Sequence, residues 1–272
     1  MTTPKPFKIA VDDSLLAFVN QRVATGRIPE GYNFPPGKEW TYGVPSQEMS
    51  RLKEYWTHKY DWRAVEARIN SYLKMFTIPI EHNGESFSMH FVHHRSEKEG
   101  AVPMLFQHGW PGSFLEPQTL TYALADSPLG QLAWIRDKMQ PLISNDYRWQ
   151  DEDVITWAMM YIIPGSTGSS AIYTNGKGKK AKIFQQVLLD KPLPAKQDFG
   201  ASVFPDDVFN VPYFWASACV SKNIVFWKEH AVGGHFASTE KPVELVEDIR
   251  EFTKNIRKEN MTALKQSGKL KL

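Results

Sequence analysis

A short apolar run at residues 102–106 leads directly into the segment His108-Gly109-Trp110-Pro111-Gly112-Ser113-Phe114. Turn residues flank the run, and its length and composition are typical of a strand buried inside a sheet. A strand that ends in His-Gly-X-Pro-Gly turns the backbone sharply, so that N–H groups face a cavity, where they can stabilise an oxyanion. An ordinary Gly/Pro turn is the alternative, but the length of the segment favours an oxyanion loop.

A second motif, Gly233-Gly234-His235-Phe236, follows a predicted strand at residues 224–227. The glycines allow a close backbone approach, and a partly exposed loop imidazole is suited to general-base chemistry. The segment Phe204-Pro205-Asp206-Asp207 follows another predicted strand, at residues 201–204, and a carboxylate there can orient the His235 ring. Inert loop histidines and Pro-Asp turns are common, so the two motifs indicate a general base and its carboxylate partner only when they are taken together.

The composition is that of a globular protein without a nucleic-acid or membrane footprint. Of 272 residues, 42% are hydrophobic and the formal net charge is +2, so neither a nucleic acid nor an acidic membrane surface is an expected partner. The basic stretch at residues 177–182 is expected to be a solvated loop. The single cysteine, Cys219, excludes an intramolecular disulfide and favours a reducing, cytoplasmic location. We find neither a bilayer-length apolar run nor a signal peptide.

Hydrophobic spacing predicts helices at both sides of the oxyanion segment and strands in the last third. The predicted helices are one capped by Ser14 over residues 15–23, one opening at Ser46, one after Asp61, one after Asp126-Ser127-Pro128, one at about 151–161 and one from Pro242. A β-hairpin is predicted from residue 77 to 93 with its turn at Asn83-Gly84. The remaining predicted strands are 201–204, 213–220 and 224–227.

These motifs and several co-linear stretches resemble the microsomal-type epoxide hydrolase family, especially its soluble fungal members. The further stretches are Tyr60-Asp61-Trp62-Arg63, Ile80–Gly84 with Met89-His90-Phe91, Ala123–Gly130 with Ala133-Trp134-Ile135, and Gly233–Ala237 with Glu240-Lys241-Pro242. The resemblance implies an α/β-hydrolase fold in four parts. These are a helical N-terminal segment (1–76), the first half of the core (77–116), a helical cap remnant (117–182) and the C-terminal half of the core (183–272).

The resemblance also implies a chemistry, hydrolysis of an epoxide to a vicinal diol with water as co-substrate and no cofactor or metal. In the family an aspartate opens the epoxide and forms an ester, which a histidine-activated water then cleaves. By the motif, His235 is that histidine and Asp207 its partner, with Asp206 as the alternative. The N–H of Trp110 becomes an oxyanion donor. Tyr173 becomes one of two tyrosines that hold the epoxide oxygen, although Thr174-Asn175 depart from the family's Lys-Glu. Epoxide metabolism and detoxification are the implied setting.

The sequence departs from the family at one place. Neither Gly-X-Asp-X-Gly nor Gly-X-Ser-X-Gly occurs, and Leu115-Glu116 runs straight into late cap sequence at Pro117. At least two core strands, the nucleophile elbow and part of the cap are expected to be missing, on the order of 100 residues or more. A mis-spliced gene model, a splice variant or an engineered deletion would each give this break, and the clean junction favours the first.

We therefore predict a truncated epoxide hydrolase that does not open epoxides. A non-catalytic binding or dimerisation module, working as a homodimer, is the alternative, because missing strands leave sheet edges and an apolar face uncovered. A metal site formed by His93, His94, His108 and His235 is less favoured. Neighbours on a strand point to opposite faces, and no acidic or cysteine ligand is suitably spaced.

Overall fold

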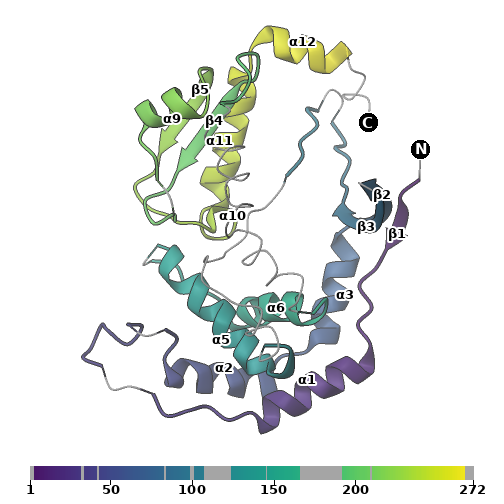
Figure 1. Cartoon of the computed structure of the whole chain (residues 1–272), viewed down its shortest axis with the longest axis vertical. Helices are drawn as coiled ribbons and strands as arrows, with labels where there is room; N and C mark the ends of the chain where they lie inside the picture. Colours follow the sequence, from purple (N-terminus) through teal and green to yellow (C-terminus); the bar gives the residue numbers. More distant parts are fainter. Residues whose placement is uncertain are drawn as a thin grey trace.

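The computed structural model describes residues 3–31, 34–41, 43–82, 84–98, 101–106, 124–144, 146–165, 192–208 and 210–266. Figure 1 shows a helical group, a small sheet beside it, and a unit of strands and helices formed by the C-terminal part. The helical group contains α1 (Asp13–Thr25), α2 (Ser46–His58), α3 (Trp62–Tyr72), α5 (Pro128–Met139) and α6 (Asp151–Ile162). These helices confirm the segments predicted from helical spacing.

Side-chain caps set where several helices begin. Asp61 caps α3 and Ser127 caps α5, each by accepting backbone N–H groups of the first turn. The predicted cap of α1, Ser14, is wrong by two residues. Asp12 is the cap, because its carboxylate accepts the Ser14 N–H at 2.8 Å and the Ser14 hydroxyl at 2.6 Å. An aspartate one step outside the helix competes successfully with a serine already inside the first turn.

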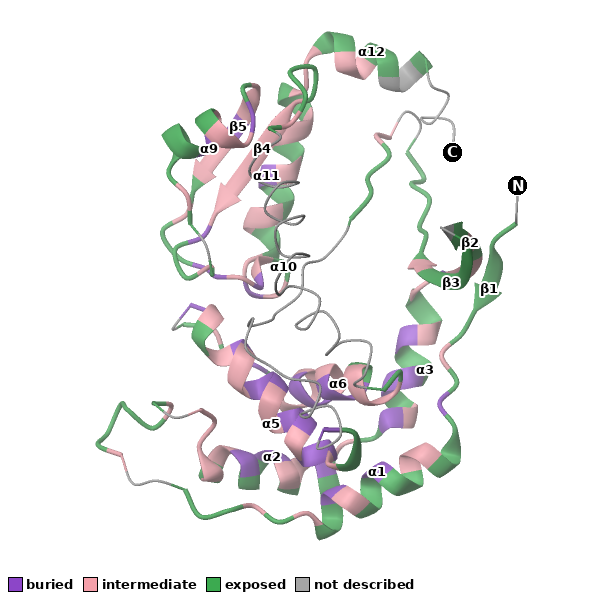
Figure 2. Cartoon of the chain, in the orientation of Figure 1, coloured by how far each residue is buried: buried purple, intermediate pink, exposed green. Residues whose placement is uncertain are grey.

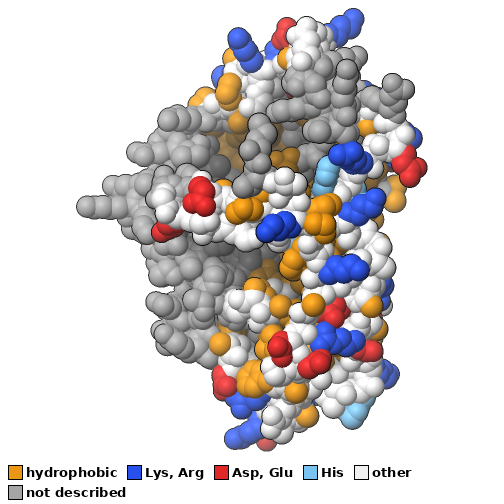
Figure 3. All heavy atoms as spheres, turned by 90° about the vertical axis from the view of Figure 1, so that its right-hand side faces the viewer, with side chains coloured by type: hydrophobic (Ala, Val, Ile, Leu, Met, Phe, Trp, Pro, Cys, Tyr) orange, Lys and Arg blue, Asp and Glu red, His pale blue; other side chains and the backbone are white. Residues whose placement is uncertain are grey.

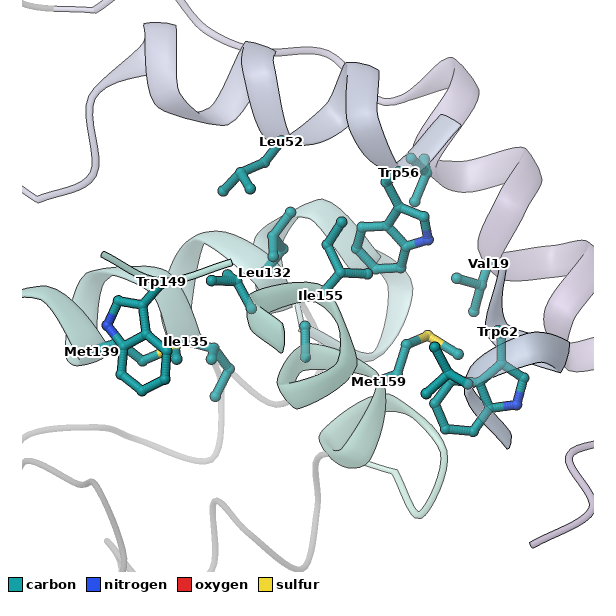
Figure 4. Close-up of a cluster of buried hydrophobic side chains, with 14 of the residues drawn as sticks. Val19, Leu52, Trp56, Trp62, Leu132, Ile135, Met139, Trp149, Ile155 and Met159 are labelled. Atoms are coloured by element: carbon teal, nitrogen blue, oxygen red, sulfur yellow. The ribbon is translucent and has the colours of Figure 1, made fainter. Parts of the chain in front are cut away.

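The main hydrophobic core lies between the helices of this group. Leu52 of α2, Leu132 of α5 and Ile155 of α6 are completely buried, and Figure 4 shows them side by side with Trp56 and Met159. Figure 2 shows the buried residues on the helix faces that point toward one another. Full burial of one such side chain stabilises the fold by about 1.5–3 kcal/mol. Packing of the amphipathic faces therefore holds the helices together, as their hydrophobic spacing predicts.

The predicted hairpin is confirmed and gains a third strand. Strand β2 (Met75–His82) pairs antiparallel with β3 (Glu85–Val92), and β1 (Lys5–Phe7) pairs with the other edge of β2. Gly84 has a φ of 82°, the left-handed conformation that the turn requires. Cross-strand partners share one face of a sheet. The pairs that make one face apolar are Phe76–Phe91, Ile78–Met89 and Ile80–Phe87.

The expected buried strand at residues 102–106 is wrong. No strand is assigned over residues 101–106, and Met104, Leu105 and Phe106 are 66%, 93% and 62% exposed. A buried strand needs neighbours that satisfy its backbone and layers that cover both faces. In the described part of the chain, the β1–β2–β3 sheet and the β4–β5 sheet are separate, so this run has no sheet to join.

The C-terminal unit is built on two parallel strands, β4 (Phe199–Val203) and β5 (Ile224–Glu229). Between them lies the helix α9 (Tyr213–Cys219), so the prediction of a strand at residues 213–220 is wrong. Parallel neighbours require a long crossover connection, which a helix provides and a further strand does not. The unit continues with α10 (Ala237–Glu240), α11 (Pro242–Asn255) and α12 (Lys258–Gln266). Helix α11 confirms the predicted closing helix.

Charges on the side of the molecule that carries α3 and the hairpin are mixed. Figure 3 shows basic, acidic and apolar side chains interspersed there, in line with a net charge of +2. Across the described ranges, no helix combines the length and apolarity needed to cross a lipid bilayer.

Candidate active site

The predicted histidine and aspartate lie at the carboxyl ends of the two parallel strands. The loop after β4 carries Asp206 and Asp207, and the loop after β5 carries His235. The two loops run side by side, because the Asp206 N–H donates to the Gly233 carbonyl at 3.0 Å. In open α/β sheets, ligands bind in the crevice outside the carboxyl ends of the strands. The strand arrangement therefore brings together residues that are 28 positions apart in the sequence.

A direct hydrogen bond joins the two side chains. His235 Nδ1 lies 2.7 Å from Asp207 Oδ1, and this oxygen also accepts the Val208 N–H at 2.6 Å. The two side chains are 26% and 36% exposed, so the pair is accessible from solvent but not fully hydrated. An ionised Asp207 places the imidazole proton on Nδ1 and leaves the lone pair on Nε2. This is the tautomer that a water-activating base needs.

The hydrogen bond shifts the pKa values of both partners. It lowers the pKa of Asp207, because the bond from His235 outweighs the opposing effect of burial. It raises the pKa of His235 above its ordinary value of 6.5, since the carboxylate stabilises the imidazolium more than partial burial disfavours it. The carboxylate therefore stabilises the imidazolium that forms when Nε2 takes up a proton.

Two glycines before His235 are required by close contacts. Gly233 has a φ of 117°, and a Cβ on it would lie 2.5 Å from the Phe204 ring. At Gly234, a Cβ would lie 2.3 Å from the carbonyl oxygen of Leu142. The absence of side chains here lets the loop rest directly on the backbone after α5, as the sequence predicts.

A second histidine–aspartate pair, which is buried, contacts the histidine loop through Phe204. His230 Nε2 lies 2.6 Å from Asp248 Oδ2, and Lys228 Nζ lies 2.8 Å from Asp248 Oδ1. Burial alone would raise the pKa of Asp248, but the hydrogen bonds it accepts outweigh burial and lower it. The Phe204 ring stacks on the His230 ring, with centroids 4.3 Å apart and planes at 5°. Phe204 therefore stays in the position that Gly233 accommodates.

Phe236 fastens the histidine loop to the helical group. Its ring makes edge contacts with Trp149 and Trp157, at centroid distances of 5.5 and 5.2 Å, and it belongs to the main hydrophobic core. The His235 N–H donates to the Leu142 carbonyl at 2.9 Å. The site therefore lies between the C-terminal unit and the segment that joins α5 to α6.

The structure separates the predicted site residues into two sets. His235 and Asp207 meet directly, and the carboxylate that contacts the imidazole belongs to Asp207 rather than to the alternative, Asp206. Trp110 and Tyr173 lie outside the described residues. Sequence reasoning assigned no role to Phe236 or Glu240, although both belong to the stretches that carry the family resemblance.

Metal-ligand geometry gives no candidate centre among the residues that the structure places. No group of three or more histidine, cysteine, aspartate or glutamate side chains is arranged to hold an ion there. Of the four histidines considered for such a site, His108 lies outside the described ranges.

Comparison with known proteins finds similarity to epoxide hydrolases. The family model described as "Epoxide hydrolase N terminus" matches residues 4–117. A Stigmatella aurantiaca protein with an epoxide hydrolase name is 24% identical over 93% of this chain and 85% of its own. Juvenile hormone epoxide hydrolase 2 of Ctenocephalides felis is 32% identical over 42% of this chain and 24% of its own.

These matches support an epoxide hydrolase of the α/β-hydrolase type. The structure of Aspergillus niger epoxide hydrolase shares its fold, with a TM-score of 0.76 over 94% of this chain and 97% of that chain, at 20% identity. The fold is therefore that of an α/β-hydrolase, with few strands in the described part of the chain.

The alignment with the Stigmatella relative is longer than this chain. It extends over 392 positions but contains 93% of a 272-residue chain, which is about 253 residues. About 140 positions of the relative therefore have no counterpart here. The match to the family's N-terminal model ends at residue 117, beside the junction inferred at Glu116/Pro117. The difference in length is of the size predicted for an internal omission, which stays a prediction.

Proposed function

We propose that this epoxide hydrolase family member retains the water-activating half of the active site and does not open epoxides. The observation that carries the proposal is the 2.7 Å bond between His235 and Asp207 in a chain without a nucleophile elbow. The proposed setting is a reducing, cytoplasmic one, in which Cys219 remains a free thiol.

The proposed chemistry follows the family's two steps. In the first, a carboxylate attacks an epoxide carbon, the C–O bond breaks, and a tyrosine such as Tyr173 protonates the oxygen. In the second, Nε2 of His235 takes a proton from water, the hydroxide attacks the ester carbonyl, and the N–H of Trp110 stabilises the oxyanion. Because the first step has no nucleophile here, no ester forms for the second step to cleave.

Turnover of a simple aryl epoxide by the purified full chain tests this proposal. Diol formation is followed by chromatography, with Aspergillus niger epoxide hydrolase as the positive control. The expected rate equals that of buffer alone, and His235→Ala leaves it unchanged. Diol formation that His235→Ala abolishes would overturn the proposal. Mass spectrometry of the acid-quenched enzyme would then locate the carboxylate that carries the ester.

A second candidate function is assembly of two copies through strand β3. Phe87 and Met89 on its apolar face are 43% and 44% exposed. Antiparallel pairing of two β3 strands about Met89 would place Phe87 of one copy opposite Phe91 of the other, so this edge is complementary to itself. The two copies would then share one continuous apolar face.

Light scattering coupled to size-exclusion chromatography tests this second candidate. The expected mass is that of a dimer for the parent chain and of a monomer for Met89→Lys. Ser88→Lys, which adds the same charge to the opposite face of the strand, is the matched control and keeps the dimer. A parent chain that stays monomeric at every concentration measured argues against assembly.

A further inference from the structure

Glu240, the last residue of α10, is a buried carboxylate with three hydrogen-bond donors. Glu240 is only 7% exposed. Oε1 accepts the Gly234 N–H at 2.9 Å, while Oε2 accepts the Ser144 N–H at 3.0 Å and the Ser144 hydroxyl at 2.9 Å. A buried carboxylate is costly unless such donors surround it, so the charge and its three partners hold one another in place.

The donors belong to two separate parts of the chain. Gly234 lies in the histidine loop, and Ser144 lies in the segment between the short 3-10 helix η1 (Gln140–Leu142) and α6. Glu240 therefore sets the separation between this segment and the loop. At the next residue, the His235 N–H donates to the Leu142 carbonyl at 2.9 Å, so two consecutive N–H groups of the loop are tied down.

Further contacts hold the same loop. The backbone of Gly234 lies against the Leu142 carbonyl, because a Cβ added to Gly234 would lie only 2.3 Å from that oxygen. Phe236 fills the core on the other side of His235. An outer ion pair between Lys241 Nζ and Asp146 Oδ2, at 3.0 Å, links the same two segments near solvent.

We infer that Glu240 is a positioning residue for His235, holding the loop backbone so that Nδ1 of the imidazole reaches Asp207. No bond joins Glu240 to the imidazole. Glu240 holds the loop through Gly234 and Ser144, and its charge also contributes to the raised pKa of His235. The inference rests on the proposed role of His235 as the water-activating base. Its measurable content is the geometry of the His235–Asp207 pair, which exists whether or not the chain opens epoxides.

Histidine-ring NMR of the full chain provides the test. The readouts are the downfield Nδ1–H resonance of the His235–Asp207 bond and the pKa of His235. In Glu240→Gln, the side-chain amide must present N–H groups to either Gly234 or Ser144, so one set of bonds is lost. The expected result is loss or broadening of the Nδ1–H resonance and a fall in the His235 pKa toward 6.5.

Two further variants complete the design. Glu247→Gln removes an equal charge from an exposed position on α11, and the Nδ1–H resonance should persist there. Ser144→Ala removes one donor and keeps the carboxylate, and it decides the question if circular dichroism shows that Glu240→Gln does not fold. Ser144→Ala should weaken the resonance.

A parent-like Nδ1–H resonance in folded Glu240→Gln would overturn the inference, whatever the pKa of His235, because loss of the Glu240 charge by itself lowers that pKa. If that variant is unfolded, parent-like values in Ser144→Ala would overturn it. Neither readout depends on epoxide turnover, so failure of this inference is distinguishable from failure of the proposed function.

Discussion

Replacing Phe236 with alanine should separate the histidine loop from the helical group. Phe236 is 8% exposed, and its ring packs edge-on against Trp149 and Trp157. It is the one described residue of the C-terminal unit that belongs to the main hydrophobic core. The Phe236→Ala chain keeps the loop backbone but loses the side chain that anchors it.

The expected cost follows from burial and ring geometry. Truncation of a buried phenylalanine to alanine costs about 3–5 kcal/mol, a range that includes the cavity left behind. Each edge contact between aromatic rings contributes about 0.5–1.5 kcal/mol beyond the area it buries. With two such contacts, we expect about 4 kcal/mol for Phe236→Ala. Since whole domains are stable by about 5–15 kcal/mol, the loop should come loose well before the helices unfold.

Urea unfolding followed by tryptophan fluorescence and circular dichroism measures this effect. Trp149 and Trp157, two of the nine tryptophans, lie beside the missing ring, so part of the fluorescence change reports its loss. The fluorescence midpoint should fall, while the helical circular dichroism changes less. Phe214→Ala is the matched control, because Phe214 is 71% exposed and its removal should cost less than about 0.5 kcal/mol. Equal midpoint shifts in the two variants would refute the reasoning.

Three further predictions follow from the same contacts. Gly234→Ala places a Cβ 2.3 Å from the Leu142 oxygen, so the loop must shift, at a cost of about 1–3 kcal/mol in thermal unfolding. A melting temperature equal to the parent's would contradict that contact. The stability difference between the parent and Asp207→Asn should peak, at about 1 kcal/mol, while Asp207 is ionised and His235 protonated. Because the pKa of Asp207 is lowered, protonation of Asp207 removes this stability only as pH falls below 3.8. Because the pKa of His235 is raised, deprotonation of His235 removes it only as pH rises past 6.5. Urea titrations across this range check the sign, and a difference independent of pH would argue against the ion pair. Ser127→Ala should cost about 1 kcal/mol through loss of the α5 cap. Denaturation of the two chains in parallel measures it, and no loss would mean that the cap contributes nothing.

Elements that depend on local chemistry agree well between sequence and structure. Helix α3 begins after Asp61 and α5 after Ser127 because a cap and a helical repeat are both encoded within a few residues. The hairpin turn at Gly84 is equally local. By contrast, residues 213–220 form a largely apolar run that the sequence analysis interprets as a strand, and only the need to cross between β4 and β5 makes them a helix.

The site shows the same division. The order of the Asp206-Asp207 and Gly-Gly-His motifs predicts a carboxylate–imidazole pair with Asp207 as the first choice, but the sequence leaves Asp206 open as the alternative. The choice of Asp207 depends on how β4 and β5 align, because the Asp206 backbone is bonded to Gly233 and the next side chain faces the imidazole. Glu240 belongs to a stretch that resembles the family, but its role was not predictable, since one of its two bonding partners, Ser144, lies 96 residues away.

The sequence by itself determined the family resemblance, most helix starts and the Gly-Gly-His loop, and it predicts the oxyanion loop and the break beside Glu116. Each of these depends on neighbouring residues or on motif order, which a linear chain displays directly. Only the tertiary structure decided that residues 102–106 lie exposed, that Asp207 is the partner of His235, and that Glu240 and Phe236 hold the loop. Burial and hydrogen bonding between distant segments exist only once those segments meet, and for residues 102–106 the strands that would bury them are absent from the described sheets.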